Sequence, residues 1–333
     1  MTAELLVDVQ DLHVTFNLPN RTVYAVNGAS FSVREGRALG IVGESGSGKS
    51  VAAQSIPRLV SSSGLRVSGR INLRHAGSEV DTLALPANGR QMREIRSGTV
   101  SVIFQEPMRS LHPMFTVGWQ IAEGLRVGKR MTGKQARERA VDLLRLVGLP
   151  DPVRNAGRFP HQLSGGMRQR VMIAIALAAS PRLLIADEPT TALDVTIQAQ
   201  ILELLGGLRR ELGMAVILIT HDLGVIAEAV DDVDVMYLGQ VVESGPVAAV
   251  MRAPLHPYTR GLISTTPRLD SVPKSDLATL KGNIPELAAP PQACVFADRC
   301  QNARAICKRP PPVEKVGDSV VRCWIYSNEW VQA

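Results

Sequence analysis

The sequence lacks an apolar run long enough to cross a membrane. Its longest clearly apolar stretch, from Val171 to Ala179, falls far short of the roughly 20 residues that a spanning helix needs. The first residues, Met1 to Glu4, also lack the basic and then apolar pattern of a signal peptide. We therefore expect a protein that reaches a membrane only through a partner.

Aromatic residues are scarce as well, at 4% of the 333 residues, and the net charge of +6 comes from Lys and Arg that are scattered along the chain. Proteins that bind nucleic acid usually have a basic stripe and an aromatic stacking platform. We therefore expect no nucleic-acid partner. No internal repeat of fixed period is present, which excludes a solenoid.

Cysteine is absent from the first 293 residues. From Pro254 onward prolines become frequent and long periodic patterns disappear. This change in composition predicts a large domain over residues 1–254 and a small C-terminal extension over residues 255–333. The extension contains all the cysteines, which are Cys294, Cys300, Cys307 and Cys323.

Short apolar runs at 38–42, 182–186 and 215–220 have the composition of buried parallel strands, and a helical pattern at 195–212 separates the last two. Alternating strands and helices indicate an α/β fold with a parallel sheet. Residues 117–148 are helical in pattern, so we expect a helical subdomain, at about 106–180, inserted into the sheet domain.

A glycine-rich loop follows the first of these strands. Its sequence is Gly43-Glu44-Ser45-Gly46-Ser47-Gly48-Lys49-Ser50, which matches the phosphate-binding pattern G-x-x-x-x-G-K-[ST] in full. Glycines let successive N–H groups surround phosphates, Lys49 can reach the β- and γ-phosphates, and the Ser50 hydroxyl can bind Mg²⁺. The loop predicts binding of a nucleoside triphosphate.

Two carboxylates end a second apolar strand, at Asp187-Glu188. Phosphoryl transfer needs charge neutralisation and an in-line nucleophile, so we expect Asp187 to hold Mg²⁺ and Glu188 to orient or deprotonate the attacking water. Acids at the end of a strand are also common at turns, and the interpretation depends on the phosphate loop.

A second glycine-rich loop, Leu163-Ser164-Gly165-Gly166-Met167-Arg168-Gln169, opens a helix that runs through Val171 to Ala179. Its hydroxyl and N–H groups could bind a phosphate. Serine is equally suited to capping a helix, and the spacing and composition leave both interpretations open.

Leu163-Ser164-Gly165-Gly166, placed between a phosphate loop and an Asp-Glu pair, resembles the signature of ATP-binding cassette (ABC) ATPases. Other landmarks of that family follow in order: Gln105 resembles the Q-loop glutamine, Ala192-Leu193-Asp194 the D-loop, and His221 the switch histidine. The resemblance implies an ABC-type P-loop NTPase.

The same resemblance implies that two such domains close head to tail, with ATP between the phosphate loop of one and the signature loop of the other. Gln105 would then contact Mg²⁺ together with Ser50 and Asp187. An aromatic residue near the end of the first strand would stack on adenine; Phe16 is our choice and Tyr24 the alternative.

The C-terminal extension resembles that of dipeptide and oligopeptide importer ATPases, on the residues His256 to Leu262, Pro267 to Leu269 and Gly282 to Pro285. The resemblance implies an ATPase at the cytoplasmic face of the inner membrane. Its partners would be two permeases, a second, non-identical ATPase subunit and an extracytoplasmic peptide-binding protein. Nickel and glutathione importers share the extension, so they remain alternatives.

The cysteines have the spacing C-x₅-C-x₆-C-x₁₅-C. In a reducing compartment such a cluster favours a metal site over disulfides. Structural zinc usually takes C-x₂₋₄-C pairs, which are absent. Four thiolates can also bind a [4Fe–4S] cluster, which relatives of this kind carry. We expect iron–sulfur first, with zinc and free or paired thiols as alternatives.

Overall fold

The computed structural model describes residues 4–106, 110–129, 131–191, 193–265, 282 and 284–331. Within these residues the strands form two sheets, an eight-stranded one and a four-stranded one. The small sheet comprises β1 (Leu5–Leu18), β2 (Arg21–Arg34), β4 (Leu65–His75) and β5 (Ser78–Asp81), in the order β2-β1-β4-β5. The large sheet comprises β11 (Val313–Val316), β12 (Ser319–Arg322), β10 (Gln240–Pro246), β9 (Asp232–Tyr237), β3 (Ala38–Val42), β8 (Ala215–Thr220), β7 (Leu183–Asp187) and β6 (Val100–Ile103), in this spatial order.

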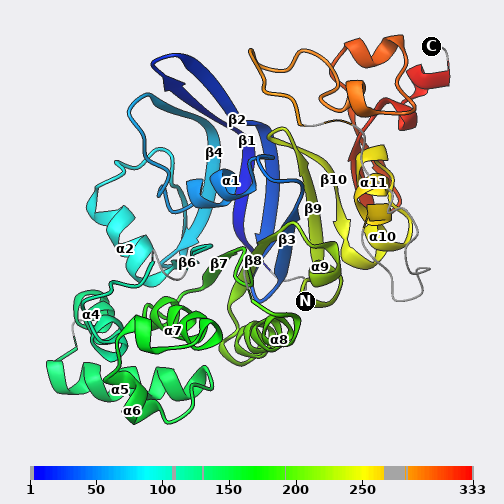
Figure 1. Cartoon of the computed structure of the whole chain (residues 1–333). Helices are drawn as coiled ribbons and strands as arrows, with labels where there is room; N and C mark the ends of the chain where they lie inside the picture. The colour runs from blue at the N-terminus through cyan, green and yellow to red at the C-terminus, as the bar shows by residue number, and fades with distance from the viewer. Residues whose placement is uncertain are drawn as a thin grey trace.

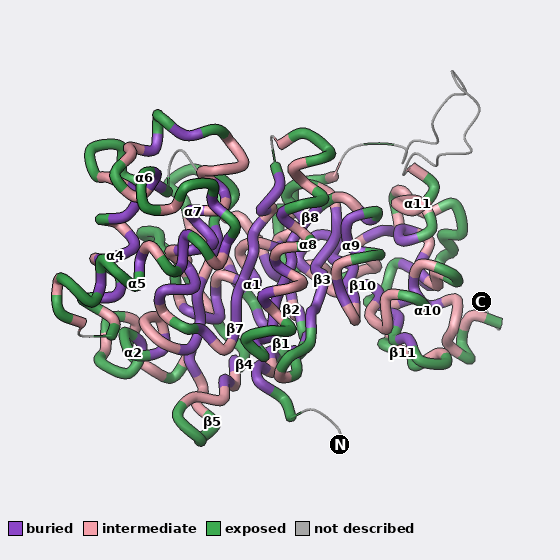
Figure 2. Tube along the Cα trace, turned by 90° about the horizontal axis from the view of Figure 1, so that it is seen from below, coloured by how far each residue is buried: buried purple, intermediate pink, exposed green. Residues whose placement is uncertain are grey.

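The centre of the large sheet is parallel. Strand β3 pairs in parallel with β8 and β9, and β7 pairs in parallel with β6 and β8. All residues of β3, β7 and β8 are buried, as expected for strands that are covered on both faces. Figure 2 shows these buried stretches along the middle of the molecule. The predicted α/β fold is confirmed.

Helices cover the sheet from both sides. The short helix α1 packs between the two sheets, where Ala52, Ala53 and Ile56 join one hydrophobic core. Met92 and Ile95 of α2 join the same core. A second core lies on the other face, beneath the helices from α4 onward. The helices are α1 (Lys49–Ser55), α2 (Arg90–Gly98), α4 (Val117–Lys129), α5 (Gly133–Leu146), α6 (Pro152–Ala156), α7 (Gly165–Ala178), α8 (Val195–Leu212), α9 (Leu223–Ala229), α10 (Val247–Arg252) and α11 (Pro257–Thr265).

Helices α4 to α7 gather at one end of the molecule (Figure 1), between β6 and β7 in the chain, where we expected a helical subdomain. The helical pattern at 117–148 forms two helices, α4 and α5. Thr132 causes the break because it accepts a hydrogen bond from the N–H of Gln135, whose side chain in turn accepts one from the N–H of Thr132. This reciprocal capping starts a new helix.

The C-terminal extension continues the large sheet. Beyond residue 254 the chain forms α11 and the strand pair β11–β12, which joins the sheet through β10. Tyr258 and Phe296 lie in the second core, where they pack against Tyr237 at ring-centroid distances of 4.7 and 5.2 Å. The elements described beyond residue 254 are short, in keeping with the loss of long periodic patterns after Pro254, and strand pairing and aromatic burial hold them in place. The domain division at residue 254 stays a prediction.

No helix in the described ranges is both long and apolar enough to cross a bilayer.

A buried acid on β9 makes stability depend on pH. Asp234 is 3% exposed, and burial raises its pKa from 3.8 to about 7, although a hydrogen bond from Ser244 opposes the shift. Between these pH values the folded chain keeps a proton that the unfolded chain has lost. The stability that this group contributes is therefore present below about pH 4 and is lost as the pH rises toward 7.

We expect Asp234→Asn to gain stability relative to the wild type as the pH rises through this window, by about 1 kcal/mol per pH unit. Urea unfolding at several pH values measures the difference. Asp142→Asn, at a 51% exposed side chain on α5, is the control. A difference between Asp234→Asn and wild type that stays constant with pH would contradict the assignment.

Candidate functional site

The glycine-rich loop connects β3 to α1, and two of its glycines cannot be replaced without a clash. Gly43 has φ 153° and a Cβ there would lie 2.1 Å from the Met236 carbonyl oxygen. Gly48 has φ 94° and its Cβ would lie 2.3 Å from the Ala25 carbonyl oxygen. Left-handed backbone and close approach both require glycine. The loop therefore curls tightly over the end of β3, beside a hollow that its residues line.

Lys49 is 5% exposed, at the first position of α1. Its ammonium donates hydrogen bonds to the carbonyl oxygens of Gly43 and Glu44, at 2.7 and 2.9 Å. Burial lowers the pKa of Lys49, and the carboxylates of Glu188, Asp187 and Glu44 oppose that shift. A largely desolvated cation thus lies inside the loop.

Asp187 ends β7 directly opposite the loop. Its carboxylate accepts hydrogen bonds from the Ser50 hydroxyl at 2.7 Å and from the Gln54 amide at 2.9 Å. Burial raises the pKa of Asp187, while these two hydrogen bonds lower it. The Ser50 and Asp187 oxygens, which we predicted to share a cation, therefore lie side by side.

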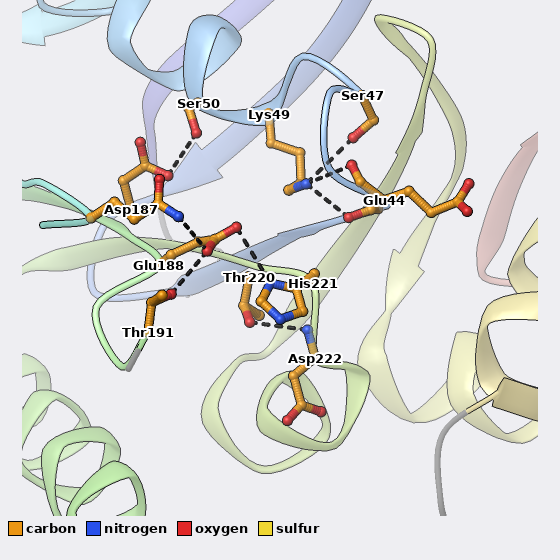
Figure 3. Close-up of polar contacts among 12 residues, drawn as sticks. Glu44, Ser47, Lys49, Ser50, Asp187, Glu188, Thr191, Thr220, His221 and Asp222 are labelled. Carbon is orange, nitrogen blue, oxygen red and sulfur yellow. Dashed lines mark hydrogen bonds and ion pairs between the residues drawn. The ribbon is translucent and has the colours of Figure 1, made fainter. Parts of the chain in front are cut away.

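Glu188 adopts a left-handed backbone conformation, with φ 45°, which is rare for a side chain of this kind. Its carboxylate accepts hydrogen bonds from the Gln105 amide at 2.8 Å and from the Thr191 hydroxyl at 2.9 Å. His221 Nδ1 lies 3.4 Å from the same carboxylate. Figure 3 shows Thr191 and His221 pointing at Glu188.

These groups meet because they end neighbouring strands. The loop follows β3, His221 follows β8, Asp187 and Glu188 lie at the end of β7, and Gln105 follows β6. The four strands are adjacent and parallel, so their carboxyl ends lie at one edge of the sheet, where α/β proteins bind ligands.

A hollow of about 580 Å³ extends from this edge toward the small sheet. Phosphate-loop residues, Gln105 and Glu188 line one end, and Phe16 and Tyr24 line the other. Both candidate aromatic residues therefore border the same space, which has the size of a small-molecule site.

The second glycine-rich loop does not belong to this hollow. Ser164 accepts a hydrogen bond from the Met167 N–H at 3.3 Å and is the N-cap of α7. Gly166 allows close packing on α8, because a Cβ at Gly166 would lie 2.8 Å from Ile197 Cγ2. Ser164, Gly165 and Gly166 are not among the described residues that line the hollow.

The D-loop lies beside this second loop. Asp194 is the N-cap of α8 and accepts a hydrogen bond from the Ile197 N–H at 3.0 Å. Leu193 faces Gly165, whose Cβ would lie 3.3 Å from Leu193 Cδ2. Ala192 lies outside the described residues, as do residues 267–269 and 283 of the predicted importer extension. Ser164 and Asp194 thus form a second surface of the same chain, and this surface is separate from the hollow.

All four cysteines are free thiols. The Cys294 N–H donates to the Cys307 carbonyl at 3.0 Å. Burial raises the pKa of Cys294 to about 12, and the charges of Cys300, Cys307 and Cys323 add to the rise, so the four thiols lie near one another. The described residues contain no group of three or more His, Cys, Asp or Glu arranged to hold a metal ion.

Contacts from the C-terminal extension to the phosphate loop were not predicted. The Tyr258 hydroxyl accepts a hydrogen bond from the Glu44 N–H at 2.8 Å, and Arg299 forms a two-pronged ion pair with the Glu44 carboxylate, at 2.7 and 3.1 Å. The Arg299 side chain is 6% exposed. These partners are more than 200 residues from Glu44 in sequence, and a sequence motif carries no signal for such a pairing.

Comparisons with known proteins agree with this geometry. Residues 26–191 match the family model "ABC transporter", and residues 242–307 match "Oligopeptide/dipeptide transporter, C-terminal region". The dipeptide transport ATP-binding protein DppD of Bacillus subtilis is 47% identical, over 97% of this chain and 95% of its own length. A protein of Brucella abortus (strain 2308) named as a peptide import ATP-binding protein is 47% identical, over 96% of this chain and 94% of its own.

Solved structures resemble the larger part of the chain. The dimeric ATP-binding cassette MJ0796 bound to ADP and Pi has a TM-score of 0.63 and 30% identity, and the match covers 72% of this chain and 98% of that one. The cbiO1 subunit from Clostridium perfringens has a TM-score of 0.61 and 28% identity, over 75% and 92%. The chain belongs to the ATP-binding subunits of ABC transporters, in the dipeptide and oligopeptide importer family.

Proposed function

We propose that this ATPase hydrolyses MgATP at the edge of its parallel sheet and thereby powers the import of dipeptides or oligopeptides through a membrane complex. The observation that carries the proposal is the convergence of Lys49, Asp187 and Glu188 at the carboxyl ends of β3 and β7, which flank β8 in the parallel sheet. The names of the relatives supply the substrate class.

Binding of the triphosphate is assigned to the phosphate loop. The N–H groups from Gly43 to Ser50 surround the phosphates, and the ammonium of Lys49 exchanges its carbonyl partners for phosphate oxygens. The residues present fit Mg²⁺, because Ser50 and Asp187 offer adjacent oxygen ligands, with Gln105 as a further ligand. The ion would neutralise charge on the phosphates.

Glu188 is assigned as the base that takes the proton from the attacking water. Gln105, Thr191 and His221 contact its carboxylate and hold it in position, since a base must lie within hydrogen-bonding reach of its proton. His221 is 62% exposed at its side chain and is placed to contact the γ-phosphate.

A complete site requires a second ATPase subunit. Ser164, Gly165, Gly166 and Asp194 form a surface apart from the hollow, which supports their assignment to the nucleotide held by the partner subunit. ATP between the two chains favours the closed pair, and hydrolysis removes the contacts that hold it closed. We propose that this partner is a non-identical ATPase.

The permease contact is assigned to the start of the helical subdomain. Phe115 and Trp119 stack at a centroid distance of 4.1 Å, and their exposed fractions are 39% and 44%. Met114 beside them is 74% exposed. Exposed aromatic residues in a cluster are typical of protein interfaces. This cluster follows Gln105 in the chain, and Gln105 contacts the Glu188 carboxylate. Gln105 would therefore couple permease binding to the position of Glu188.

The complete assembly would contain two permeases, a second ATPase and an extracytoplasmic peptide-binding protein, with this chain at the cytoplasmic face of the inner membrane. Co-purification from detergent extracts tests this assignment. Two hydrophobic permeases in the eluate would support it. RNA or ribosomes in their place would instead support a soluble ABC ATPase that acts on nucleic acid.

We further propose that the four cysteines bind a [4Fe–4S] cluster. Four gathered free thiols supply the right number of ligands. The C-x₂₋₄-C pairs usual for structural zinc are absent. In a cluster each of the four thiolates would bind a different iron. Its role would be to hold a segment whose small separate core is centred on Ile306, Cys307 and Trp324.

We expect anaerobically purified protein to be brown and to contain four iron and four sulfide per chain. Cys300→Ser should lose the visible absorbance, because it removes one ligand. Gln301→Ser introduces the same side chain at the exposed neighbour of Cys300 and removes no thiol, so it should keep the absorbance. Stoichiometric zinc without iron would contradict the proposal.

A further inference from the structure

A segment of the C-terminal extension borders the nucleotide hollow. Residues 284–287 line it together with Phe16, Arg21 and Tyr24, from which they are separated by about 260 residues of chain. In Figure 1 the orange segment after the grey trace reaches toward the hairpin of β1 and β2. The hollow is therefore bounded by the cassette and by the extension together.

Two aliphatic side chains of the segment are partly buried, and the two residues between them are exposed. Ile284 and Leu287 are half-buried and pack against the second core, while Pro285 and Glu286 are exposed. Both carboxylate oxygens of Glu286 accept hydrogen bonds from Arg21 Nη1 at 2.9 Å. This ion pair joins the segment to the turn between β1 and β2, across the hollow.

Ile284 also borders a second hollow, which adjoins the first. That space is lined by the phosphate-loop residues 43–45, by Gln105, Glu188 and His221, and by Ile284. The segment thus extends along the site from the aromatic end to the catalytic end. Ile284 therefore borders both hollows, in addition to packing against the core.

We propose that Ile284 and Leu287 form the second wall of the nucleotide-base subsite, opposite Phe16 and Tyr24. The inference rests on the proposed function, in which this hollow binds ATP. A purine is flat and largely apolar on both faces, so an aromatic residue on one side leaves the other face in water. Aliphatic side chains remove that face from water and add affinity. The base is therefore bound within a single chain, before the partner ATPase closes.

The ion pair between Arg21 and Glu286, which joins this wall to the hairpin, is exposed to solvent. Its side chains are 57% and 83% exposed at Arg21 and Glu286, and salt screens exposed ion pairs. The pair therefore contributes little to holding the segment against the hairpin.

Isothermal titration of the full chain with MgATP and with magnesium tripolyphosphate, which has no base, tests the inference. The double variant Ile284→Ala/Leu287→Ala should bind ATP about tenfold more weakly, because it removes several buried methyl and methylene groups, and should bind tripolyphosphate as the wild type does. Val331→Ala, at an 88% exposed side chain of the same extension, should bind both ligands normally.

Unchanged ATP affinity in the double variant, or an equal loss for tripolyphosphate, would overturn the inference. If the double variant unfolds, the two single substitutions give the same comparison, each with a smaller loss confined to ATP. A wild-type chain that binds neither ligand would instead contradict the proposed function, and so would a Lys49→Ala variant that binds both normally.

Discussion

Replacing Glu188 with glutamine is expected to lower the rate of ATP hydrolysis by about 10²- to 10⁴-fold, the usual contribution of a general base, and to preserve ATP binding. Glutamine keeps the size and the hydrogen-bonding oxygen of the side chain but cannot accept the proton of water. The contacts of Gln105 and Thr191 with this side chain keep the site intact, so the ATP-bound, closed pair should accumulate.

Phosphate release under saturating MgATP measures the rate, and gel filtration with ATP measures closure. Glu203→Gln, on the exposed face of α8, is the matched control and should hydrolyse ATP at the wild-type rate. A Glu188→Gln chain with a near-normal rate would show that another group activates the water.

Replacing Lys49 with alanine is expected to weaken ATP binding by about 10- to 100-fold, since a hydrogen bond from a charged donor contributes about 1.5–3 kcal/mol. Lys49 is 5% exposed, and water competes poorly with phosphate for its ammonium. Hydrolysis should be lost together with binding.

The pKa of Lys49 adds a pH dependence. Because burial lowers this pKa, the cation is lost at a lower pH than for an exposed lysine, and ATP affinity should fall early as the pH becomes alkaline. Lys134→Ala, at an exposed position in α5, is the control in titrations across pH. Normal ATP affinity in Lys49→Ala would contradict the assignment of the phosphate loop.

The sheet and the nucleotide motifs were predictable because their determinants are local. The runs at 38–42 and 215–220 are apolar throughout, which identifies buried parallel strands, and each motif follows such a run within a few residues. Parallel strands place their carboxyl ends at one edge, so motifs that follow such strands lie near one another, as Glu188 lies near Gln105 and His221.

The role of the extension in the fold was not predictable in the same way. Strand pairing between β10 and β12 joins residues about 75 positions apart, and the contacts of Tyr258 and Arg299 with Glu44 join residues more than 200 positions apart. Such contacts depend on the packing of the whole chain. The proline-rich composition after residue 254 carried no long periodic pattern, and the burial of Tyr258 and Phe296 in a core left no signal in the sequence.

The measurement that tests the central claim most directly is peptide uptake into proteoliposomes that contain the purified complex. The peptide-binding protein and labelled peptide are placed on one side of the membrane, and MgATP on the side of this chain. We predict uptake that requires ATP and that stops when the complex carries Glu188→Gln. Equal uptake with the wild-type chain and with Glu188→Gln, or uptake without ATP, would contradict the claim that this chain powers transport.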